Sequence, residues 1–235
     1  MMGLLERIID WDQEMLLLVN GNHLPWLDRF MWLLSETMMW APVLLVMIIV
    51  LIRNKKGQTF LILLTFGLLL VFTDQISSGV IKPLVARFRP TYDPEIANLV
   101  QVVNHYKGGE YGFISSHAAN VFAFAGLGIL FFRDWLYASV ILLWAIAVSY
   151  SRIYLGVHFP MDVISGALFG ILSSIAFYYL YKFIIQKSTG IRLISDRRSR
   201  QMTRSNYRKS DLCFIVISLL LVVVTMLSAS YYLTW

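Results

Sequence analysis

The stretch SRIYLGVHFPMD, residues 151–162, joins two long apolar segments and sets where one helix ends and the next begins. Pro160 is a favoured first residue of a helix, so Asp162 falls in the first turn, four residues after His158. A carboxylate bonded to one imidazole nitrogen fixes the tautomer and leaves the other nitrogen free to attack. Histidine can act as a nucleophile toward phosphorus, and Arg152 offers paired donors to phosphate oxygens. For His158 and Asp162 alone, a polar cap on a membrane helix is an equally good interpretation.

Two further stretches place polar groups at the ends of apolar segments. Ser115 and Ser116 are good N-cap residues, and the free N–H groups of a helix N-terminus suit an anion. The adjacent His117 can protonate a leaving-group oxygen and later activate water. Upstream, Lys82 and Arg89 precede a helix-stopping proline and can neutralise charge on phosphoryl oxygens. Taken singly, a capped helix start and snorkelling cations at a helix end are the better interpretations.

The composition indicates an integral membrane protein. Of 235 residues, 58% are hydrophobic and only 14% are charged, and several apolar runs approach the length that spans a bilayer. The formal charge is +6, and the basic residues flank the apolar runs. This placement favours a bilayer with anionic lipids as the partner and argues against nucleic acid. Nothing in the sequence indicates a protein partner.

We expect an all-α integral membrane bundle of six transmembrane helices with an N-terminal interfacial helix. That first helix covers Met1–Asn20, where several carboxylates argue against a membrane crossing. The stretch lacks the basic n-region of a signal peptide, so we expect no cleaved signal peptide. The expected spans are roughly Phe30–Ile52, Thr59–Ile76, His117–Phe132, Trp135–Tyr150, Pro160–Ile185 and Leu212–Leu233. The chain then divides into an N-terminal interfacial segment (1–25), a membrane core (26–185), a basic cytoplasmic loop (186–210) and a C-terminal transmembrane helix (211–235).

The basic connections orient these spans. With six crossings, three connections that carry Lys or Arg fall on one side: residues 53–56, Arg133 and residues 187–209. The positive-inside rule makes that side cytoplasmic. The three polar stretches then fall together on the outer side, where cations run against the rule and therefore point to a function. One shared phosphate site explains this placement better than three unrelated helix ends.

Two smaller features concern packing and access. The connection from Thr91 to Gly112 is long and mostly polar, and loops of this length are often functional or disordered. It either shapes substrate access or serves as a solvated connector. In the fifth span, Gly166 and Gly170 are four residues apart and permit close packing of another helix.

Together the polar stretches resemble the type 2 phosphatidic-acid phosphatase superfamily of membrane lipid phosphatases, over roughly residues 26–185. The family motifs read K-x6-R-P, P-S-G-H and S-R-x5-H-x3-D. The first matches at Lys82, Arg89 and Pro90, and the third at Ser151, Arg152, His158 and Asp162. The second matches at Ser115 and His117, whereas Ile114 stands in place of the family proline and Ser116 in place of the glycine.

The resemblance implies a six-helix core that requires no metal and no other cofactor. It implies that His158 attacks phosphorus to form a phosphohistidine, that Asp162 orients it, and that His117 serves first the leaving group and then water. The phosphoryl oxygens would be bound by Lys82, Arg89, Ser115, Ser116 and Arg152, with Arg87 as a weaker candidate. The implied substrate is a lipid phosphate such as phosphatidic acid, phosphatidylglycerophosphate, undecaprenyl diphosphate or a lipid A phosphate.

The sequence therefore predicts a metal-independent phosphatase that removes a terminal phosphate from a membrane lipid. Its active site is expected on the outer, periplasmic face of a bacterial-type inner membrane. The same site could instead pass phosphate from one lipid to another, as a phosphotransferase. An anion-binding transporter is the weaker alternative, because transporters tend to place polar groups near mid-membrane in repeated halves.

Overall fold

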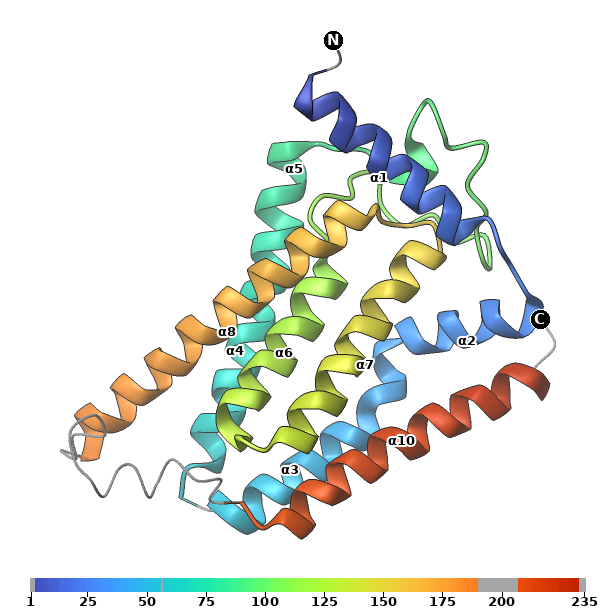
Figure 1. Cartoon of the computed structure of the whole chain (residues 1–235). Coiled ribbons are helices and arrows are strands. Elements are labelled where there is room, and N and C mark those ends of the chain that lie inside the picture. Colours follow the sequence, from blue (N-terminus) through green and yellow to red (C-terminus); the bar gives the residue numbers. More distant parts are fainter. Residues whose placement is uncertain (1–2, 56, 190–206, 233–235) are drawn as a thin grey trace.

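A computed structural model describes residues 3–55, 57–189 and 207–232, and the regular structure within these ranges is helical (Figure 1). The α-helices are α1 (Leu4–Asn20), α2 (Pro25–Ser35), α3 (Ala41–Lys55), α4 (Thr59–Gln75), α5 (Lys82–Val85), α6 (Ser116–Phe132), α7 (Trp135–Tyr154), α8 (Pro160–Thr189) and α10 (Lys209–Tyr232). Short 3-10 turns cover Thr37–Trp40 and Pro90–Tyr92, and a π-helical turn covers Ile76–Ile81. The expected all-α class is confirmed.

Apart from a break at Glu36, the described residues of the expected membrane segments are helical. Among the described residues, five stretches are long and apolar enough to cross a membrane: Thr37–Lys55, Thr59–Val85, Trp135–Tyr154, Pro160–Lys187 and Lys209–Tyr232. The shorter α6 is also apolar and corresponds to the third expected span. The count of six crossings and the interfacial position of α1 stay predictions. Most of the predicted basic loop, residues 190–206, lies outside the described residues.

The first expected span, Phe30–Ile52, is wrong as a single helix. The helix α2 ends at Ser35, and Glu36 takes an extended conformation with φ −76° and ψ 117° before the chain re-enters helix. One backbone group released by this break finds a partner, because the Trp40 indole donates to the Leu34 carbonyl at 3.2 Å. The physical reason for the break is the cost of a charged side chain within an apolar membrane helix.

The second expected span continues beyond Ile76. The helix α4 runs through the π-helical turn into α5 and stops where Ala86 adopts a left-handed conformation with φ 50°. Lys82 therefore projects from the end of a long helical stretch. Turns of the π type are frequent at functional sites, which suits a segment that must aim one side chain.

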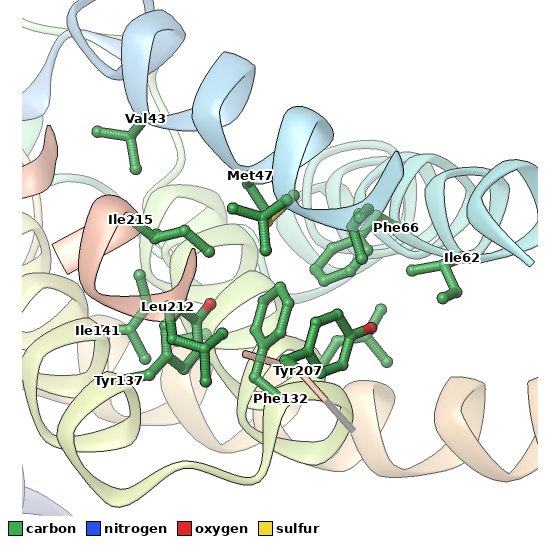
Figure 2. Close-up of a cluster of buried hydrophobic side chains, with 14 of the residues drawn as sticks. Val43, Met47, Ile62, Phe66, Phe132, Tyr137, Ile141, Tyr207, Leu212 and Ile215 are labelled. Atoms are coloured by element: carbon green, nitrogen blue, oxygen red, sulfur yellow. The ribbon is translucent and has the colours of Figure 1, made fainter. Parts of the chain in front are cut away.

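Figure 2 shows the main apolar core, which combines side chains from α3, α4, α6, α7 and α10. Phe132 at the end of α6 contacts Tyr137 and Tyr207, with ring centroids 4.7 and 4.8 Å apart. The described basic connections lie at this end of the bundle too, since Arg133 follows Phe132 and the Lys55 ammonium lies 5.4 Å from the Tyr207 ring centroid. The three polar stretches lie at the opposite end of the bundle, where α5 and α7 finish (Figure 1).

The helices α6 and α8 form the most extensive helix pair of the bundle. A Cβ atom at Gly166 would collide with the carbonyl oxygen of Ser115, and one at Gly170 would collide with that of Ala119. The backbone of α8 therefore lies directly on the backbone of α6. The interpretation of this glycine pair as a packing feature within the chain is confirmed.

Replacement of Gly170 by alanine should destabilise the fold. The added methyl group has no space against Ala119, and overpacking of this kind costs about 1–3 kcal/mol. We expect Gly170→Ala to lower the unfolding temperature of the detergent-solubilised protein, measured by tryptophan fluorescence. Gly67→Ala on α4 is the matched control, because no neighbouring atom lies within 4 Å of its added Cβ. Equal unfolding temperatures for the two variants would contradict the tight contact between α6 and α8.

Candidate active site

The three polar stretches come together at the end of the bundle where α5 and α7 finish and α6 and α8 begin (Figure 1). His158 lies in the short loop between α7 and α8, and Asp162 lies in the first turn of α8. Both side chains are buried, at 1% and 0% exposure. The Ser115 amide donates to the Asp162 carbonyl oxygen at 2.9 Å, so the start of α6 is joined to the start of α8.

The imidazole of His158 has a partner on each ring nitrogen. Arg89 Nη1 lies 2.9 Å from His158 Nε2 and also donates to the Val157 carbonyl at 2.9 Å. His158 Nδ1 lies 3.4 Å from Asp162 Oδ2. Because a guanidinium group can only donate, Nε2 is the acceptor and Nδ1 carries the proton that faces Asp162. The lone pair on Nε2 is therefore the one available for attack.

The surroundings keep His158 neutral. Burial lowers the pKa of His158 well below its ordinary value of 6.5, and the charges of Arg89, Arg152 and Lys82 lower this pKa further. The charge of His117 has the same effect, which brings the second predicted histidine into the neighbourhood of the first. A neutral imidazole has the lone pair that a nucleophile requires.

Two guanidinium groups bring unpaired donors to this site. Arg152 is 3% exposed and Arg89 is 7% exposed, and within the described part of the chain the Nε atom of each is buried without a hydrogen-bond partner. A buried donor that lacks a partner is costly, so such groups mark places where a ligand completes the hydrogen bonding. Guanidinium donors match the spacing of phosphate oxygens. This pair of guanidinium groups is therefore suited to bind an oxyanion.

Lys82 reaches the same place from the end of the α4–α5 helical stretch. Its Nζ donates to Ser116 Oγ at 2.7 Å, and that hydroxyl also shares a hydrogen bond with Ser78 at 2.8 Å. Lys82 and His117 are partly exposed, whereas His158 is fully enclosed. An anion would therefore approach the buried donors from the side of Lys82 and His117.

Asp12 in α1 is not among the predicted site residues, and Arg87 appears there only as a weaker candidate. In the structure, Arg87 Nη2 donates to Asp12 Oδ2 at 2.6 Å and Nη1 donates to Asp162 Oδ1 at 3.0 Å. Asp12 is 1% exposed. No motif distinguishes it from the other carboxylates near the N-terminus, so its burial is the only signal and comes from the fold.

A second unpredicted polar pair lies within the apolar helices. Asn120 follows His117 by one turn of α6 and donates to Asp74 of α4 at 3.4 Å. Its side-chain oxygen accepts a hydrogen bond from Thr73 at 2.6 Å. Polar groups in a membrane segment are expensive unless they pair with one another, and these bonds satisfy that requirement.

The connection from Thr91 to Gly112 is packed against the site. The Arg89 amide donates to the Glu110 carbonyl at 2.9 Å, and the Tyr106 ring centroid lies 5.8 Å from the Arg152 guanidinium. A solvated connector would make neither contact. The packing therefore favours the interpretation of a loop that shapes access to the site.

The sequence profile of the PAP2 superfamily matches residues 59–186 of this chain. The chain belongs to the PAP2 superfamily. It is 38% identical over 180 residues to the lipid A 4'-phosphatase of Bacteroides thetaiotaomicron. That alignment covers 75% of this chain and 80% of the Bacteroides protein. The lipid A 4'-phosphatase of Porphyromonas gingivalis is 35% identical over 182 residues and covers 76% of each chain. The predicted membership among membrane lipid phosphatases is confirmed.

The fold likeness extends to a solved PAP2 structure. The crystal structure of a transmembrane PAP2-type phosphatidylglycerolphosphate phosphatase from Bacillus subtilis matches this chain with a TM-score of 0.57 at 22% identity. The match covers 79% of this chain and 90% of that chain. At this level of identity the comparison concerns the fold, and it supports the helical membrane architecture described above.

In this PAP2 protein the departure from the second family motif has a structural consequence. Ser116 stands where the family has glycine, and its hydroxyl accepts the hydrogen bond from Lys82, which glycine could not do. The helix start remains capped, because Ser115 Oγ accepts from the Ala118 amide at 3.4 Å. The Ser116 hydroxyl thus adds a fixed partner for the Lys82 ammonium group.

Arg89→Gln should alter the pH dependence of this PAP2 enzyme. Loss of the cation raises the pKa of His158 toward 6.5, although burial, the larger cause of the lowered pKa, remains. His158 then becomes protonated at a higher pH than in the wild type. If the neutral imidazole is the nucleophile, as the sequence predicts, the acidic limb of the kcat/KM profile should move to higher pH, in addition to a lower rate from loss of the predicted phosphate contact.

The profile is measured for both proteins with one lipid phosphate substrate, so that titration of the substrate is common to the two curves. Arg133→Gln, at the opposite end of the bundle, is the control and should leave the limb in place. A limb that does not move in Arg89→Gln would contradict the electrostatic control of His158 by this cation.

Proposed function

We propose that this protein is a lipid A 4'-phosphatase that acts through a phosphohistidine intermediate. The observation that carries the reaction type is the buried, neutral His158, which is held by Asp162 and lies beside unpaired guanidinium donors. The choice among lipid phosphates is supported by the two relatives of that name, which match at least 75% of this chain. Of the four substrates named above, a lipid A phosphate is therefore favoured.

In the first step, His158 Nε2 attacks phosphorus, the N–P bond forms, and the bond from phosphorus to the lipid oxygen breaks. Arg89 Nη1, which lies on Nε2 in the resting site, turns to a phosphoryl oxygen as substrate enters. Arg152 and Lys82 bind the other phosphoryl oxygens and offset the developing charge. Once the bound phosphate dianion offsets the charges of the neighbouring cations, protonated His117 gives its proton to the departing lipid oxygen.

In the second step, neutral His117 takes a proton from water, and the water oxygen attacks phosphorus. The N–P bond breaks, orthophosphate leaves, and His158 returns to its neutral form. Asp162 faces the Nδ1 proton throughout and stabilises the positive charge on the imidazole ring while phosphorus is attached. Ser115 and Ser116 at the start of α6 complete the oxyanion site.

We place this chemistry on the outer, periplasmic face of a bacterial-type inner membrane. The described cations Arg53, Lys55 and Arg133 lie at the end of the bundle opposite the site (Figure 1). The positive-inside rule assigns that basic end to the cytoplasm, where anionic headgroups would pair with it.

The first test is phosphate release by purified protein in detergent. Lipid A that carries the 4'-phosphate is compared with phosphatidic acid, phosphatidylglycerophosphate and undecaprenyl diphosphate. We expect the fastest release from lipid A, none from His158→Ala, and a kcat lower by about 10²–10⁴-fold in His117→Ala. Cys213→Ala, which alters an exposed side chain near the start of α10 at the opposite end of the bundle, is the control and should retain the wild-type rate.

Release of phosphate by folded His158→Ala would overturn the assignment of His158 as nucleophile, and faster release from another lipid would overturn the proposed substrate.

Among the described residues, no group of three or more His, Cys, Asp or Glu side chains is arranged to hold a metal ion. The proposed hydrolysis is metal-independent, so a chelator should leave the rate unchanged.

The fate of the phosphoryl group separates hydrolysis from transfer. With lipid A labelled in its 4'-phosphate and an acceptor lipid present, we expect the label in free orthophosphate. Label in the acceptor lipid would instead identify the enzyme as a phosphotransferase that uses the same site.

A further inference from the structure

One face of α1 is buried at the end of the bundle that holds the active site. Asp12, Leu16 and Asn20 follow one another at four-residue spacing and so share one side of the helix. Each is at most 1% exposed, whereas Glu14 on another face is exposed. The helix lies across the ends of α7 and α8 (Figure 1). A helix that merely rests on the membrane surface would not bury an aspartate and an asparagine.

Two of these residues hold the loop that carries the nucleophile, residues 155–159. Asn20 Nδ2 donates to the Tyr154 carbonyl at 2.7 Å, where the loop leaves α7. Leu16 belongs to a buried apolar cluster with Phe159, where the loop enters α8. The helix α1 therefore contacts both ends of this loop.

Asp12 reaches closer to the chemistry. Its Oδ1 accepts a hydrogen bond from the Met161 amide at 2.8 Å, at the first turn of α8. Its Oδ2 accepts from Arg87 at 2.6 Å, and the same guanidinium donates to Asp162 Oδ1 at 3.0 Å. The guanidinium carbon of Arg87 also lies 4.2 Å from the centroid of the Phe159 ring, which restricts its position. One cation is thus shared between two buried carboxylates.

This sharing bears on which oxygen of Asp162 stays turned toward the histidine. In the structure Arg87 contacts Oδ1 alone, whereas Oδ2 accepts from the Phe159 amide at 3.1 Å and faces His158 Nδ1 at 3.4 Å. An Arg87 without Asp12 would be free to take both oxygens of Asp162, because guanidinium and carboxylate favour a two-bond pairing. The oxygen that orients His158 would then be drawn away from it.

We propose that α1 is a positioning element of the active site, in which Asp12 acts through Arg87 to keep Asp162 turned toward His158. The inference rests on the proposed function, because it takes His158 as the nucleophile. It assigns a positioning role to a helix outside residues 59–186, the part of the chain that matches the family profile.

Asp12→Asn isolates the charge. Asparagine retains a side-chain oxygen that can accept from the Met161 amide but lacks the negative charge that pairs with Arg87. We expect kcat to fall by about tenfold or more, since partners that orient a reacting group usually matter at this level. KM should stay within about twofold, because Asp12 does not contact the phosphate donors. Glu14→Gln removes a carboxylate from the exposed face of the same helix and should keep the wild-type kcat.

Two further variants separate positioning from general stability. In an Arg87→Lys background, Asp12→Asn should cost much less than in the wild type, because the residue through which it acts is already altered. Asp12→Glu retains the charge and should recover part of kcat. Unfolding temperatures are measured for every variant, so that a loss of folded protein is not mistaken for a loss of turnover.

All rates are measured on the lipid phosphate that the wild type hydrolyses fastest. Wild-type kcat in Asp12→Asn, additive losses in the double variant, or Asp12→Glu no better than Asp12→Asn would each overturn the inference and leave the proposed function intact. A wild-type protein that releases no phosphate from any lipid would overturn both.

Discussion

The close contact between α6 and α8 is the constraint on which the candidate site depends. Gly166 lets the backbone of α8 approach the Ser115 carbonyl, and the Ser115 amide in turn donates to the Asp162 carbonyl. The start of α6 and the start of α8 are thereby held in one geometry. His117 comes from the first helix and Asp162 from the second, so a wider spacing would separate the proposed acid from the pair that forms the nucleophile. The packing of the α6 and α8 backbones thus sets the relative positions of the side chains that form the candidate site.

The second feature that shapes the site is its surplus of positive charge. Arg89 and Arg152 are buried with donors left unpaired, and Lys82 adds a third cation beside them. Asp162 is the carboxylate beside these cations, and Arg87 shares it. Buried charges are unfavourable without a partner, and a phosphate dianion would supply one. Under the proposed function, this positive charge would contribute affinity for the phosphoryl group. Orthophosphate carries similar charge and would then compete with the substrate.

Where the structure departs from expectation, the reasons are physical and local to particular residues. The helix predicted over Phe30–Ile52 breaks at Glu36. The prediction missed this break because hydrophobicity alone does not show how one carboxylate will leave an apolar layer. The helical stretch predicted to end at Ile76 continues to Val85 and carries Lys82. The sequence did not predict this extension, because the π-helical turn before Lys82 has no clear sequence signal. Asp12 reads as one of several surface carboxylates, yet it is buried against Arg87.

The sequence by itself determined the helical membrane class and the set of candidate phosphate ligands. Apolar runs in a bilayer must satisfy their own backbone hydrogen bonds, so their length and composition are enough to predict helices. The pairing of His158 with Asp162 could also be predicted from the sequence, because side chains four positions apart at a helix start are within reach of each other. Only the tertiary structure decided that Arg87 would share its charge with Asp12, which lies 75 residues before it in the chain. Contacts between such distant segments follow from how the helices pack, and no local pattern of residues encodes them.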